Sequence, residues 1–331
     1  MRRTLTVLVL ALCALFLVRS FAGAGTRAAT GAALTRLSPA LPVALIPAVA
    51  ALWLTALSWR EPLQALSVPL SRAAAVRIFA AGQLGRYVPG VMWSIVLQSR
   101  LAAASGITVL HLTVAFGAGA GVALSTGAVL GLPALAGYAY GTGAAVLAAA
   151  LTPGALWFLP RVLTAAVRLL TALPALARRL APVPRDVLRR SVWLYAAAWV
   201  VTGTHLWLLA VALGADPLAA VVPCVAGFTL ATALASVVVV VPDGLGVREA
   251  LLAVFLASVL PAPEAVVAAA ASRLVLAAAD VLAFAYGSLA VRRTGTKAED
   301  TGPSAGPGLR SAPGSPGAPA PPPKADVSSS G

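Results

Sequence analysis

Charged side chains are scarce in this sequence. Only 10% of its 331 residues are Asp, Glu, Lys or Arg, whereas a soluble globular domain carries about a quarter. Hydrophobic residues make up 60% of the chain, and the mean hydropathy is +0.92. So few charges cannot cover a surface exposed to water. The composition therefore excludes a soluble protein and predicts an all-α, polytopic integral membrane protein.

Acidic residues, lysines and cysteines are scarcer still. The chain has 10 Asp and Glu against 24 Lys and Arg, a net charge of +14, and only Lys297 and Lys324 are lysines. No basic stretch alternates with stacking aromatic residues, so we expect no nucleic-acid partner. Cys13 and Cys224 both lie in apolar runs, which excludes a disulfide framework and any metal-binding spacing.

Recognisable enzyme motifs are also absent. The sequence contains no phosphate-binding GxxxxGK[ST] loop, no HExxH zinc motif and no GxSxG nucleophile elbow. We therefore expect no catalytic residues, no metal and no cofactor, and predict that the chain is not an enzyme.

Apolar runs divide the chain into about eight predicted transmembrane helices. The first run competes with a cleaved signal peptide, because small residues at 22–24 have cleavage spacing, but we favour an uncleaved span. The predicted spans are Thr4–Val18, Pro39–Trp59, Ile107–Leu132, Gly137–Leu159, Trp193–Leu213, Ala219–Val241, Val247–Leu260 and Ala265–Val291.

Arginines predict the orientation of these spans. Residues 161–190 hold seven arginines, which is typical of a cytoplasmic loop and here joins two halves of a transmembrane domain at 1–293. Arginines at the start of the chain and at 292–293 place both termini in the cytoplasm. Residues 20–38 then form an external loop. Residues 294–331 are rich in Pro, Gly and Ser and predict a disordered cytoplasmic tail.

Two stretches interrupt the apolar sequence with proline, glycine and charge: Gln83–Trp93 and Pro242–Glu249. Interrupted helices in both halves are typical of transporter binding sites. The arginines within Ala73–Ala104 are too closely spaced for a lipid-facing span, so we predict a re-entrant broken-helix element there. An amphipathic helix on the inner surface is the alternative for this segment, and a cytoplasmic turn is the alternative for the second stretch.

The sequences of these stretches, QLGRYVPGVMW and PDGLGVREALL, resemble the two signature stretches of the lysylphosphatidylglycerol synthase transmembrane family. The resemblance covers about residues 1–293 and does not extend to the soluble synthase domain of some members. It implies a flippase-like protein that translocates a phospholipid or lipid-linked substrate between the leaflets of the plasma membrane.

Polar residues at the breaks and in the last two spans are the candidate substrate-binding residues. If spans 247–260 and 265–291 form a hairpin, Glu249 lies opposite about residues 273–277, and Arg248 lies opposite about residues 277–280. Arg248 and Glu249 are neighbours about 100° apart on a helix, so we expect them to have partners elsewhere. This cluster could fix helix packing or handle substrate. The candidates are Gln83, Arg86, Tyr87, Gly90, Gly244, Gly246, Arg248, Glu249, Arg273 and Asp280.

The arginines would attract a phosphate, so the expected partner is an anionic or phosphate-headgroup membrane lipid. Two alternatives stay open: a non-catalytic subunit of a separately encoded lipid-modifying synthase, and a membrane enzyme acting on lipid-linked substrates. A homo-oligomer is compatible with each. His205 lies in the middle of the fifth span, where a packed or hydrogen-bonded histidine is favoured over a proton relay.

Overall fold

The computed structural model describes residues 24–66, 68, 70–85, 92–103, 105–171, 183–237 and 246–300. All regular secondary structure in these residues is α-helical, which confirms the predicted all-α class. The chain divides into two compact units, Met1–Arg292 and Arg293–Gly331. The packing described below lies within the first unit.

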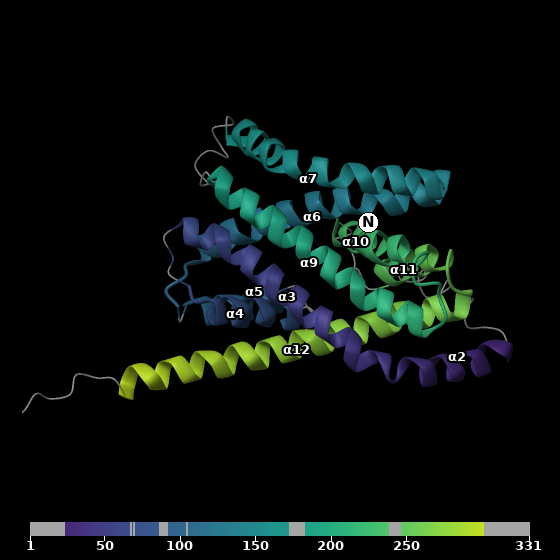
Figure 1. Cartoon of the computed structure of the whole chain (residues 1–331). Helices are drawn as coiled ribbons and strands as arrows, with labels where there is room; N and C mark the ends of the chain where they lie inside the picture. The colour runs from purple at the N-terminus through teal and green to yellow at the C-terminus, as the bar shows by residue number, and fades with distance from the viewer. Residues whose placement is uncertain are drawn as a thin grey trace, which may run out of the picture. The chain divides into compact units, whose positions relative to one another are not determined.

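Five long helices carry most of the apolar sequence (Figure 1): α3 (Ala40–Ala65), α6 (Val109–Tyr140), α7 (Thr142–Thr171), α9 (Arg185–Ala212) and α12 (Ala262–Asp300). Each contains a stretch long and apolar enough to cross a membrane. Many of their large apolar side chains point outward, where lipid rather than water would cover them. The chain is a multi-pass membrane protein.

The remaining helices are shorter: α2 (Ala24–Leu37), α4 (Arg72–Gly85), α5 (Met92–Ala103), α10 (Val221–Val237) and α11 (Val247–Leu256). At 1.5 Å per residue, the 14 residues of α4 reach about 21 Å, less than the roughly 30 Å of a bilayer core. α4 packs against α5, and α10 packs against α11. Each pair is separated by one of the two interrupted stretches.

Some of the predicted spans coincide with long helices of the structure and others do not. Those at 39–59, 107–132, 137–159, 193–213 and 265–291 coincide with the five long helices. Those at 219–241 and 247–260 correspond to the shorter helices α10 and α11. The span predicted at 4–18 lies outside the described residues. A count of eight spans and a re-entrant element therefore stay predictions.

The turn between the third and fourth predicted spans lies later than expected. α6 continues through Pro133 to Tyr140, and the chain turns at Gly141, whose φ is +87°. Only glycine adopts that conformation without steric cost. The spans predicted at 107–132 and 137–159 place this turn at 133–136, but the break falls at Gly141.

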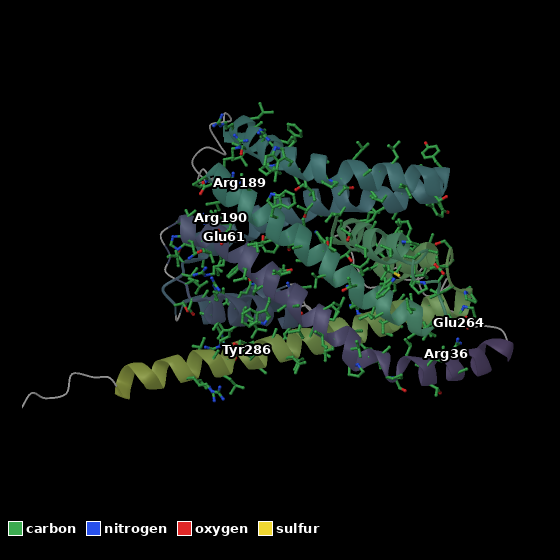
Figure 2. The ribbon with its side chains drawn as sticks, viewed as in Figure 1. Arg36, Glu61, Arg189, Arg190, Glu264 and Tyr286 are labelled. Atoms are coloured by element: carbon green, nitrogen blue, oxygen red, sulfur yellow. The ribbon has the colours of Figure 1, made fainter. Side chains whose placement is uncertain are left out.

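The segment 20–38, expected as an external loop, is helical over most of its length, because α2 occupies Ala24–Leu37. Its external position stays a prediction. The segment is rich in alanine, the strongest helix former. The Arg36 side chain donates to the Leu213 carbonyl at 3.1 Å and lies 3.5 Å from the Glu264 carboxylate (Figure 2). A cation at the C-terminus of α9 stabilises the carbonyl groups that end that helix.

The structure also differs from the prediction at the ends of the basic segment and at the start of the C-terminal tail. The basic segment 161–190 is helical at both ends, because α7 continues to Thr171 and α9 begins at Arg185. At the C-terminus, α12 continues to Asp300, so the tail predicted from residue 294 begins inside a helix. Lys297, Ala298 and Glu299 are good helix formers, and the first proline after the last span is Pro303.

Small residues bring α3, α9 and α10 close together. α3 packs along α9, where the hydroxyl groups of Ser58 and Ser191 each donate to the other's carbonyl, at 3.0 and 3.3 Å (Figure 1). Gly203 of α9 faces the backbone of Val225 in α10. Close backbone contacts of this kind are typical of helices that associate within lipid.

α12 packs into the same core and also reaches α4. Its buried residues from Ala265 to Ala279 belong to a cluster formed with α3, α9, α10 and α11. Further along, Gly287 lies against the backbone of Arg77 in α4. These contacts bring the last helix beside the two short helix pairs.

Replacing Gly203 by alanine should loosen the contact between α9 and α10. A Cβ atom there would lie 2.6 Å from the Val225 Cα, so the helices must separate. Overpacking costs about 1–3 kcal/mol, and Gly203→Ala should melt at a lower temperature in detergent than the wild type. Gly154→Ala in α7 is the control, since no described atom lies within 4 Å of a Cβ there. Equal melting temperatures would contradict this packing.

Candidate functional site

A cavity of about 600 Å³ lies among α3, α4, α6, α9, α10, α11 and α12; we call it the central cavity. Its volume falls within the range of small-molecule binding sites. Three of the predicted site residues line it: Gln83 from α4, Arg248 from α11 and Asp280 from α12. The fold therefore gathers charges from the second half of the sequence and an amide from the first half around one space.

Aromatic rings form much of the remaining wall. Trp199 is held in place by α6, because its indole N–H donates to the Thr126 hydroxyl at 3.1 Å. The ring of Phe228 lies against Trp199 with centroids 6.4 Å apart. The other aromatic residues of the wall are Phe79, Phe116 and Tyr195. Charged groups facing apolar rings interact strongly, because little water screens them.

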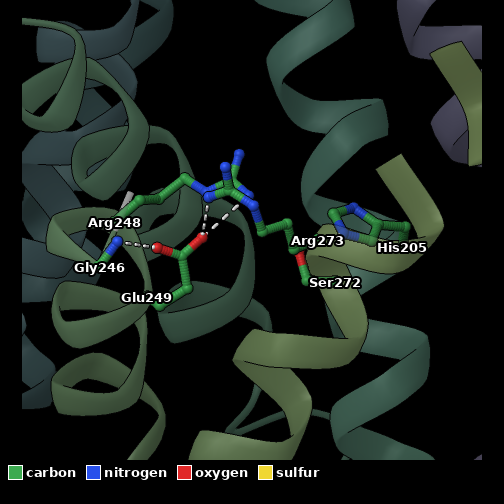
Figure 3. Close-up of polar contacts among 6 residues, drawn as sticks. All are labelled: His205, Gly246, Arg248, Glu249, Ser272 and Arg273. Carbon is green, nitrogen blue, oxygen red and sulfur yellow. Dashed lines mark hydrogen bonds and ion pairs between the residues drawn. The ribbon is translucent and has the colours of Figure 1, made fainter. Parts of the chain in front are cut away.

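A compact charge cluster adjoins the cavity (Figure 3). The Arg273 Nη1 atom donates to Glu249 Oε1 at 2.7 Å, and the Arg248 Nη2 atom donates to the same oxygen at 3.3 Å. The other carboxylate oxygen of Glu249 accepts the Gly246 N–H at 2.7 Å. One carboxylate thus joins two guanidinium groups and the first turn of α11.

The position predicted for Glu249 opposite the start of 273–277 is confirmed by its contact with Arg273. The expectation that Arg248 and Glu249 do not pair is wrong. Their Cα–Cβ bonds diverge as expected for neighbours, but the long, flexible arginine side chain curves back toward the carboxylate. Burial favours this geometry, since an arginine within an apolar core needs a nearby acceptor.

Asp280 is 3% exposed and lies seven residues after Arg273 on α12. It lines the central cavity with Arg248, so an acid and a base share one wall. Gly246 adopts a φ of +85° directly before α11, a conformation that favours glycine. That turn directs its N–H toward Glu249, so the glycine serves the helix end rather than the cavity.

The other four candidates, Arg86, Tyr87, Gly90 and Gly244, lie outside the described residues. The described chain ends close to the cavity before each gap, because Gln83 lies in the last turn of α4 and Ser236 in the last turn of α10. The last described turn before each gap therefore contributes a residue to the same cavity.

No protein-family model, curated protein or solved structure matches this chain. The family membership expected from the two stretches therefore stays a prediction, and the site has to be argued from its own geometry.

His205 is buried in a hydrogen-bonded position, as its place in the span predicts. Its Nε2 atom lies 2.8 Å from the Ser272 hydroxyl, and its Nδ1 atom contacts the Thr202 carbonyl. A carbonyl can only accept, so Nδ1 carries a proton. The two contacts of the ring hold His205 between α9 and α12 (Figure 3).

Sequence reasoning missed the aromatic wall and Thr232. Thr232 is one of the residues that line the central cavity. Its Oγ1 atom is buried and has no hydrogen-bond partner in the described part of the chain. Threonine in an apolar span gives no signal of its own. Trp199 does offer one, because tryptophan favours the membrane interface and this residue lies well inside a span.

Glu249→Gln should destabilise the protein more than Arg273→Gln. Glutamine can still accept the Gly246 N–H, but the buried guanidinium of Arg248 and the half-buried guanidinium of Arg273 lose the carboxylate that they share, and losing one partner of a buried ion pair costs about 3–5 kcal/mol. Arg273→Gln leaves Glu249 with Arg248, so its loss should be smaller. The double variant should be more stable than Glu249→Gln alone, because it removes one of the two guanidinium groups that lost the carboxylate.

Thermal unfolding of the four proteins in detergent measures this coupling as a double-mutant cycle. Arg36→Gln is the control; it breaks a pair whose arginine side chain is 46% exposed, so its loss should stay below about 1 kcal/mol. Additive losses for Glu249 and Arg273 would show that the two side chains are not coupled.

Proposed function

We propose that this protein translocates a lipid with a phosphate-bearing headgroup between the leaflets of the plasma membrane. The observation that carries the proposal is the central cavity, enclosed among apolar helices with Arg248 and Asp280 in its wall. Charges at membrane depth are costly and usually mark a substrate route or site. A cavity of this size suits a headgroup, so the acyl chains would remain in the surrounding lipid.

Arg248 is the group proposed to bind the phosphate. A guanidinium forms short, charge-assisted hydrogen bonds with phosphate oxygens. Arg248 shares Glu249 with Arg273, and its contact, at 3.3 Å, is the longer of the two. A phosphate could therefore take over Arg248 while Glu249 keeps Arg273 and the Gly246 N–H. Binding would exchange one charged partner for another without leaving a buried charge alone.

The short helix pairs supply the proposed moving parts. In this proposal α4 and α5 are the two arms of a re-entrant element, and α10 and α11 are a second broken pair within an eight-span topology with cytoplasmic termini. Broken helices are tolerated at membrane depth where their open backbone lines a wet cavity. Both pairs contribute residues to the central cavity, which supports this assignment.

Arg248→Gln should slow lipid translocation at least tenfold, because a charged hydrogen bond contributes about 1.5–3 kcal/mol. The assay uses purified protein in phosphatidylcholine vesicles that carry a fluorescent phosphatidylglycerol, with a membrane-impermeant quencher to report the outer leaflet. Arg36→Gln is the control, since Arg36 lies outside the central cavity. A wild-type protein that moves no lipid would sink the proposal, as would equal rates for wild type and Arg248→Gln.

Thr232→Val separates substrate handling from folding. The change removes a buried hydroxyl that has no partner among the described residues, so the melting temperature should stay equal or rise. If the hydroxyl donates to the headgroup, translocation should fall by about threefold to tenfold. Thr229→Val, one turn earlier, is the matched control: its hydroxyl donates to Val225 within α10 and does not line the cavity. Unchanged transport in Thr232→Val would remove Thr232 from the site.

A further inference from the structure

A second polar hollow, of about 360 Å³, lies between the middle of α7 and the start of α9. We call it the arginine pocket. Trp157, Pro160 and Arg161 line it from α7, and Arg185, Asp186, Arg189 and Trp193 line it from α9. It shares no residue with the central cavity. Three of its seven lining residues are arginines, and one is an acid.

The position of the pocket along the helices corresponds to a membrane–water interface. α7 is apolar from Thr142 to Pro160, and 19 residues rise about 28 Å, close to the thickness of a bilayer core. In α9 the apolar stretch begins at Trp193, after two turns that carry the charges. Tryptophans favour this depth, and Trp157 and Trp193 mark it on both helices.

The arginines of the pocket outnumber the acids near it. Arg189 and Arg190 are adjacent on α9 (Figure 2), and both border a neighbouring hollow that also holds Glu61, but only Arg189 lines the arginine pocket as well. Arg190 lies 3.9 Å from the Glu61 carboxylate of α3 and does not line the arginine pocket. Arg161 contacts the Trp157 carbonyl at 3.4 Å and the Phe158 ring at 5.2 Å, neither of which carries a negative charge.

The apolar part of α7 also exposes large side chains. Leu151 and Phe158 are each about 60% exposed or more. A ligand that fits both surfaces needs an anionic group at the interface and hydrocarbon below it. A free phosphate would use the arginines but leave the apolar surface unused.

We propose that the arginine pocket binds the headgroup phosphate of an anionic phospholipid whose acyl chains lie along the exposed face of α7. Two or three guanidinium groups would surround the phosphate, and the lipid would link α7 to α9. The proposal does not depend on translocation through the central cavity, since a protein that moves no lipid could still bind one here.

Phosphatidylglycerol should therefore stabilise the purified protein, and phosphatidylcholine with the same acyl chains should not. Melting temperature is measured in dodecyl maltoside micelles while either lipid is titrated. A ligand that binds only the folded state raises the melting temperature as it saturates. Arg161→Gln and Arg189→Gln should each raise the half-saturating phosphatidylglycerol concentration about tenfold.

Arg190→Gln is the matched control, because it removes the same charge one residue away but outside the pocket. Its half-saturating concentration should equal that of the wild type. Equal responses of all three variants would overturn the proposal, as would equal stabilisation by phosphatidylcholine. Glycerol 3-phosphate and inorganic phosphate form a further arm: if either stabilises as well as the lipid, the pocket binds a free anion and the lipid assignment is wrong. The two pocket substitutions are on exposed side chains, so both variants should fold and give a titration midpoint.

Discussion

The Glu249 carboxylate accepts hydrogen bonds from the first turn of its own helix, from Arg248 beside it and from Arg273 on α12. A carboxylate gives up its hydration when it is buried. Three donors replace most of that stabilisation, whereas any one of these donors alone would leave the carboxylate under-satisfied. The contact also fixes the register of α11 against α12. Because Arg248 and Asp280 line the central cavity, the shape of that cavity depends on this register.

Two kinds of packing surround the cavity. α3 and α9 are held together along their length by small residues and by the paired hydroxyl groups of Ser58 and Ser191. The short pairs α4–α5 and α10–α11 have fewer residues over which to distribute such contacts. Motion is cheapest where the least contact is lost, so a rigid frame of long helices with shorter pieces between them suits a cavity that must open.

Much of the fold could be predicted from the sequence, because length and hydropathy alone identify a helix that spans a membrane. The hairpin register could be predicted as well: equal depth from a shared turn places Glu249 opposite about residues 273–277. Features governed by local detail could not. The turn at Gly141 depends on one backbone angle, the Arg248 contact on side-chain flexibility, and α2 on alanine content that hydropathy does not report. The aromatic wall was missed because apolar rings facing lipid and apolar rings facing a cavity look the same in a sequence.

Arginine does two different tasks in this protein, and depth in the membrane separates them. Inside the bundle, Arg248 and Arg273 converge on a carboxylate, because a lone buried charge would cost more than helix packing returns. At the arginine pocket the side chains are exposed, so water can stabilise their charge, and Arg161 and Arg189 face a hollow whose wall holds a single acid. The same residue type is therefore a paired structural element at depth and an anion-attracting group at the interface. The composition shows only that arginine is in excess and does not separate these two roles. The position of each side chain along its helix distinguishes an arginine enclosed by protein from one that lipid headgroups can reach.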